Sequence, residues 1–133
     1  MTNKMEGKSK FPPGFFKIQL RLAREPGHPE GSALRGYDIV VPLTKERRID
    51  ASAWKKSREL CRVVHYKDSE EHDIGHIVHQ PGGTWSLRFD IQGDDDDAVG
   101  YRFGSEHFVV GEYMSLREGE TLHTYRVTAV EEL

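Results

Sequence analysis

The sequence contains very little cysteine, and it lacks long apolar runs. Its 133 residues include one cysteine, Cys61, so no disulfide can form within the chain, and a reducing compartment such as the cytoplasm is expected. No stretch reaches the roughly 18 consecutive apolar residues of a membrane helix. The polar start has no apolar run with a small-residue cleavage site, which disfavours a secretory signal. These absences predict a soluble cytoplasmic protein with no membrane partner.

Catalytic and cofactor signatures are scarce as well. No Gly-x-Ser-x-Gly elbow presents a nucleophilic serine, and Asp94–Asp97 lack the spacing of an EF-hand calcium loop. Those four aspartates instead predict a solvated loop. Cys61 lies at the end of the apolar face of a segment with helical periodicity, which predicts an inert buried thiol. We therefore expect no cofactor and no catalytic residue, and we favour a protein that is not an enzyme.

Acidic residues are few in the first half of the chain, and basic residues are few in the second half. Residues 1–67 carry 15 Lys and Arg against 7 Asp and Glu, whereas residues 68–133 carry 4 against 15. Such an asymmetry is typical either of a basic surface for an acidic partner or of two halves that attract each other within one fold. The whole chain has a net charge of −3, and this disfavours nucleic acid as the partner.

Alternating apolar residues are abundant, and they predict strands. In Phe15–Arg24 and again from Tyr37 to Leu43, every second side chain is apolar. Pro42 predicts an edge position for the second of these strands, because proline cannot donate a ladder hydrogen bond. Further alternating segments are Arg62–Lys67, Ile74–Gln80, Trp85–Ile91, Val99–Phe103, Phe108–Arg117 and Thr121–Val130.

One helix is predicted, from Ala51 to about Leu60. Asp50 is a suitable N-cap, and Ile49 and Trp54 occupy the two positions of a hydrophobic staple. The fold class is therefore mainly β (α+β by strict count): an antiparallel small barrel or two-layer sandwich of about eight strands, with one helix packed on it. Residues 1–13 are predicted to be a flexible tail and residues 14–133 a single domain.

The connection Arg24–Gly36 is the first candidate site, because long ordered loops are often functional. It lacks the Gly-Lys-Ser/Thr ending of a phosphate loop. Its polar residues predict a ligand or partner site made by Arg24, Glu25, His28 and Arg35.

Clustered histidines are the second candidate. In a symmetric hairpin over residues 62–80, His65 lies opposite His76, close enough to share a metal ion. A metal-dependent or acid–base enzyme site around this pair is the alternative to the binding function. Glu112 would add an inward carboxylate to it, unless a bulge at Gly111 turns its side chain outward.

The third candidate is a basic patch on the helix and its approach, where phosphates would bind if the protein were a nucleic-acid-binding module. Its residues are Lys45, Arg47, Arg48, Lys55, Lys56 and Arg58. The favoured interpretation remains a non-catalytic domain, monomeric or homodimeric, that binds a protein partner or a small ligand.

Overall fold

Strands of an antiparallel sheet make up most of the structure, which is a computed structural model. It describes residues 11–24, 29–66, 72–79, 85–89, 98–100, 107–118 and 120–133. The strands are β2 (Phe15–Leu22), β3 (Ser32–Pro42), β4 (Arg62–Tyr66), β5 (His72–His79), β6 (Trp85–Phe89), β7 (Ala98–Gly100), β8 (Tyr113–Glu118) and β9 (Thr121–Glu132). The helix α1 (Ala51–Lys56) and the 3₁₀ turn η1 (Arg58–Leu60) lie between β3 and β4.

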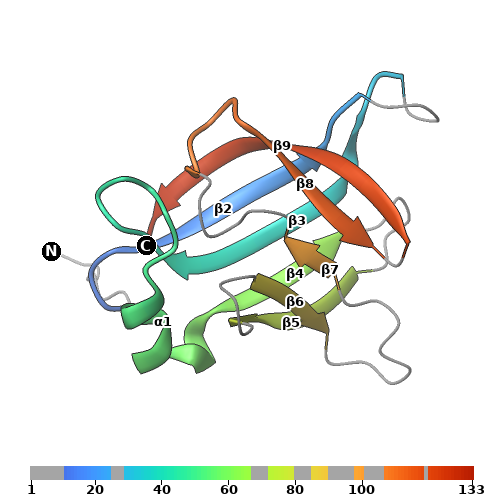
Figure 1. The fold of residues 1–133 in the computed structure, drawn as a ribbon. Helices are drawn as coiled ribbons and strands as arrows, with labels where there is room; N and C mark the ends of the chain where they lie inside the picture. Colours follow the sequence, from blue (N-terminus) through green and yellow to red (C-terminus); the bar gives the residue numbers. More distant parts are fainter. Residues whose placement is uncertain are drawn as a thin grey trace, which may run out of the picture.

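Each strand pairs with the next one along the chain, and β9 pairs back with β2. Seven strands of five to twelve residues form a strongly curled sheet, and the three-residue strand β7 completes the ring between β6 and β8. Figure 1 shows this curled sheet with α1 beside the end of β3. The prediction of a mainly β, antiparallel fold is confirmed, and the strand order is that of an up-and-down barrel.

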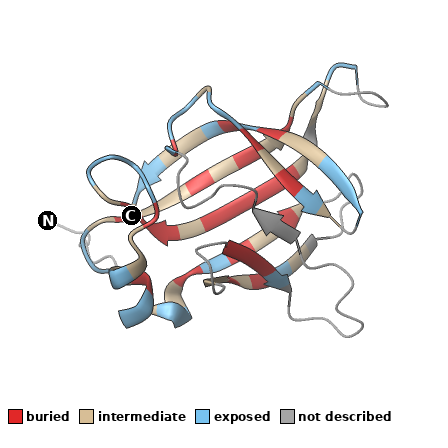
Figure 2. Cartoon of the chain, in the orientation of Figure 1, coloured by how far each residue is buried: buried red, intermediate tan, exposed pale blue. Residues whose placement is uncertain are grey.

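Alternation along the strands separates the interior from the outer surface. Ile18, Leu20 and Leu22 of β2 are buried, as are Tyr37, Ile39 and Val41 of β3, and the residues between them face outward or are half-buried. Figure 2 shows the buried positions recurring along the strands, whereas α1 exposes most of its surface. The core therefore fills the inside of the curled sheet. Among the residues that the structure describes, no helix combines the length and apolar character that spanning a membrane requires.

The helix is shorter than predicted. Asp50 is its N-cap and accepts a hydrogen bond from the Ala53 backbone N–H at 3.1 Å, as the sequence predicts. Helical geometry stops at Lys56, because Ser57 adopts φ −139° and ψ 45°, and a 3₁₀ turn then continues to Leu60. Trp54 is buried, so the short helix still contributes one large side chain to the core.

Two local predictions about β3 are wrong. The strand begins at Ser32, four residues before the predicted end of the preceding loop. The register then shifts from Arg21 opposite Gly36 to Leu22 opposite Ser32, so the intervening residues of β3 form a bulge. Nor is β3 an edge strand, since it pairs with both β2 and β4. Pro42 is tolerated there because it is the last residue of β3, beyond the ladder with β4, which ends at Ile39.

Candidate functional site

Several polar side chains gather inside one end of the barrel, the end at which β3 begins and β8 finishes. They lie there because successive side chains of a strand point alternately to the inner and the outer face of the sheet. Glu118 continues the inward series of Met114 and Leu116 in β8. Arg35 lies two residues before the inward-facing Tyr37 in β3, and in β9 His123 lies two residues before the inward-facing Tyr125. We call Arg35, Tyr37, Glu118, His123 and Tyr125 the Glu118 cluster.

Glu118 is the common acceptor of this cluster. The hydroxyls of Tyr37 and Tyr125 both donate to its Oε2, at 2.6 Å and 2.5 Å. Its Oε1 accepts from Nη2 of Arg35 at 3.0 Å and lies 3.9 Å from Nε2 of His123. The rings of Tyr37 and Tyr125 meet edge to face with centroids 5.2 Å apart. The distant strand β3 is thus joined to the β8–β9 hairpin at one carboxylate.

Two further polar residues adjoin the cluster. The ring of His65 stacks on that of Tyr37, with centroids 4.3 Å apart and an angle of 9° between the planes. Asp73 lies directly opposite His65 across the β4–β5 ladder, so its side chain is on the same face of the sheet. The inner surface therefore changes along the barrel. It is apolar near α1, where Phe15, Trp54 and Trp85 are buried, and polar around Glu118.

The environment keeps Glu118 ionised. Burial raises the pKa of this carboxyl, but the hydrogen bonds from Tyr125 and Tyr37 lower it, and so do the nearby His65 and Arg35. The net result is a pKa below the ordinary value of 4.5. Burial, and then the negative charge of Glu118, raise the pKa of both tyrosines well above 10.0. At neutral pH the cluster therefore holds a carboxylate, a guanidinium and two protonated phenols.

The pKa values of the cluster do not favour proton transfer at neutral pH. A general acid or base is most effective when its pKa lies near the working pH. The pKa of Glu118 moves down, away from neutrality, and those of Tyr37 and Tyr125 move up, also away from it. Hydrogen bonds in fixed directions are what the cluster offers.

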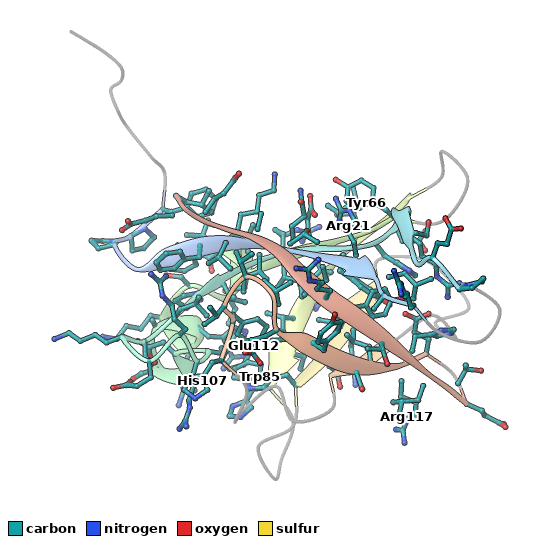
Figure 3. All side chains as sticks on the ribbon, turned by 90° about the horizontal axis from the view of Figure 1, so that it is seen from above. Arg21, Tyr66, Trp85, His107, Glu112 and Arg117 are labelled. Atoms are coloured by element: carbon teal, nitrogen blue, oxygen red, sulfur yellow. The ribbon has the colours of Figure 1, made fainter. Side chains whose placement is uncertain are left out.

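The predicted loop site is divided by the structure. Arg35 belongs to the Glu118 cluster, whereas Arg24 lines a separate hollow on the outer surface of β2 and β9. Glu25 and His28 lie outside the described residues. On that outer surface Arg21 forms an ion pair with Asp38 at 3.2 Å, and its guanidinium lies 5.1 Å from the ring centre of Tyr66. Figure 3 shows Arg21 and Tyr66 next to each other.

The predicted pairing of His65 with His76 is wrong. The β4–β5 register places His65 opposite Asp73 and His76 opposite Arg62. His65 faces the interior and is 8% exposed, whereas His76 has the parity of the outward side chains and lines an outer groove. The two imidazoles are thus on opposite faces of the sheet and cannot share an ion. Nowhere in the described part of the chain do three or more His, Cys, Asp or Glu side chains come together as metal ligands would.

The residues of the predicted basic patch are all exposed, but they divide between two places. Lys45, Arg47 and Arg48 lie in the loop after β3, where Arg47 covers the ring of Phe16 at 4.6 Å and Arg48 approaches His107 at 3.4 Å. On α1 and η1, Lys55 and Arg58 line a groove against β5, while Lys56 does not.

Sequence reasoning missed Glu118 and considered Glu112 instead. Glu112 is exposed and lies just before β8, next to Gly111, which adopts φ +99°. The signal for Glu118 was present in the sequence, since it has the same parity as Met114 and Leu116. Tyr37 and Tyr125 lie in alternating segments that the sequence predicts to be strands, but nothing in the sequence indicated that their hydroxyls share an acceptor.

Comparison with known proteins adds no relative. No protein family matches the chain, and neither a curated protein nor a solved structure resembles it significantly.

Proposed function

We propose that this protein is a non-catalytic binding barrel that holds a small, uncharged, hydrogen-bonding molecule at the Glu118 cluster. The observation that carries the proposal is a half-buried carboxylate that two tyrosines and an arginine hold in one orientation inside the barrel. The mouths of barrels are common places for ligand sites. Fixed polar groups at such a site determine how a ligand is oriented.

Partial exposure of the cluster supports this function. Tyr37 and Tyr125 are fully buried, but the side chains of Glu118, Arg35 and His123 keep 16%, 21% and 15% of their surface exposed. These three side chains therefore reach the surface and can contact a molecule from outside. A purely structural network needs no such access.

Charge balance supports an uncharged ligand. Glu118 and Arg35 neutralise each other at 3.0 Å, and the two phenols carry no charge at neutral pH. A charged molecule would lose its hydration at this site without gaining a counter-charge. A hydroxyl, an amide or a heteroaromatic N–H would instead exchange hydrogen bonds with water for hydrogen bonds with the cluster at little cost.

A fragment screen by NMR tests this proposal. We expect uncharged alcohols, amides and heteroaromatic fragments to shift the ring resonances of Tyr37 and Tyr125, and we expect the Tyr125→Phe variant to lose those hits. The Tyr113→Phe variant is the matched control, because Tyr113 is 58% exposed on the outer surface. An empty screen contradicts the proposal, as do hits that Tyr125→Phe binds equally well once its fold is verified by circular dichroism.

A further inference from the structure

A groove on the outer surface separates α1 and η1 from β5, away from the Glu118 cluster. Its volume is about 730 Å³, within the usual range for small-molecule sites. The lining residues that the structure describes are Trp54, Lys55, Arg58, Glu59, Arg62, His76, Ile77, Val78 and His79. Four separate elements, α1, η1, β4 and β5, thus line one hollow.

The lining is strongly basic. Lys55 comes from α1, Arg58 from η1 and Arg62 from the start of β4. Two residues of β5, His76 and His79, also line the groove. Among the lining residues that the structure describes, Glu59 is the single carboxylate. The electrostatic field in the groove therefore favours an anion, and the convergence of three permanent cations favours a dianion over a single carboxylate.

One of the cationic groups, that of Arg58, is held by packing. The guanidinium of Arg58 lies over the ring of Trp54, 4.7 Å from its centre. Trp54 is anchored in turn, since its Nε1 donates to the carbonyl oxygen of Ile77 at 3.1 Å and its ring meets that of Trp85 edge to face. The imidazole of His79 stacks on Trp85 with centroids 4.1 Å apart. A ligand that binds here has less side-chain motion to freeze, so more of the interaction energy contributes to affinity.

We propose that this groove binds the phosphate group of a small phosphorylated molecule. Phosphate monoesters carry close to two negative charges at neutral pH, and guanidinium groups bind their oxygens through paired N–H donors. The volume of the groove suits a single small molecule. Lys56, next to Lys55 on the same exposed helix, lies outside the lining.

Titration calorimetry with ribose 5-phosphate and inorganic pyrophosphate tests the proposal, with ribose as the uncharged comparison. We expect both phosphates to bind and ribose not to bind. Lys55→Met and Arg58→Met each remove one cation and keep an apolar stem, so each should weaken binding about fivefold. Lys56→Met is the matched control, because it removes the same charge from the same helix outside the groove, and it should leave the affinity unchanged.

Three results would overturn the proposal. The first is no binding of either phosphate. The second is an equal loss in Lys56→Met and Lys55→Met, because this would mean attraction to the net charge of the helix rather than a site. The third is tighter binding of a single-stranded oligonucleotide than of ribose 5-phosphate, which would identify a nucleic-acid surface instead. Shifts of the His76 and His79 ring resonances on adding phosphate would support the groove as the binding site.

Discussion

Removing one hydroxyl from the Glu118 cluster should destabilise the fold by a measurable and pH-dependent amount. Tyr125→Phe deletes the 2.5 Å hydrogen bond to Oε2 of Glu118 and leaves the fully buried ring in place. Hydrogen bonds to a charged group contribute about 1.5–3 kcal/mol to stability. The lower part of this range applies, because Tyr37 still donates to the same oxygen. We expect the free energy of unfolding to fall by about 2 kcal/mol at pH 7.

The pH dependence follows from the lowered pKa of Glu118. Because this pKa is lower in the folded protein than in the unfolded chain, acid protonates the unfolded chain first. The stability that the carboxylate contributes is present above its ordinary pKa of 4.5 and is lost as the pH falls through the lower folded value. Tyr125→Phe weakens this effect, so the stability gap between wild type and variant should narrow as the pH drops below 4.5.

Urea unfolding followed by tryptophan fluorescence measures this gap, since Trp54 and Trp85 are both buried. Tyr113→Phe makes the same chemical change at an exposed site and should alter stability by less than about 0.5 kcal/mol. If Tyr125→Phe is as stable as Tyr113→Phe at pH 7, the hydroxyl contributes nothing. If the loss is the same at pH 7 and pH 3, the hydroxyl does not act through the ionised carboxylate.

Two further predictions concern the close packing of the barrel wall and the buried thiol. Gly36→Ala should destabilise the fold by about 3 kcal/mol or more in urea unfolding, because a Cβ there would lie 1.9 Å from the Leu20 carbonyl oxygen. In Gly111→Ala the added Cβ meets no atom within 4 Å, so this control should lose only about 1 kcal/mol, through the positive φ of the residue. Equal losses in the two variants would contradict the steric argument. Burial raises the pKa of Cys61 to about 12, so a thiol reagent at pH 8 should modify the protein only after unfolding, and rapid reaction with the folded protein would refute this.

Much of the architecture was predictable because strand periodicity is a local property. The alternating residues of β2 and β3 face the interior as the sequence indicates, as do Tyr125 and Val127 of β9, and Asp50 caps the helix as predicted. The local sequence is sufficient for these predictions, because the face of the sheet to which a side chain points depends on whether its position in the strand is odd or even. The errors occur where a prediction depends on the pairing register between two strands. His65 and His76 were paired by assuming a symmetric hairpin, and a shift of an odd number of residues places them on opposite faces.

The contrast in charge between the two halves also has a partial structural explanation. The ion pair between Arg35 and Glu118 joins the basic half of the chain to the acidic half, as expected if the halves attract each other within one fold. The acidic runs 68–71 and 94–97 lie outside the described residues. The predicted positive patch keeps its exposure, but the structure divides it between the loop after β3 and the groove beside β5.

By itself, the sequence determined that this chain is a mainly β, antiparallel fold with one capped helix, because periodicity and capping act over a few neighbouring residues. It also places Tyr37 and Tyr125 in alternating segments. Their shared contact with Glu118, together with that of Arg35, depends on the tertiary structure. Glu118 lies more than 80 residues from Arg35 and Tyr37. Closing the sheet sets the register of strands that are distant in the sequence, and no local pattern specifies that closure.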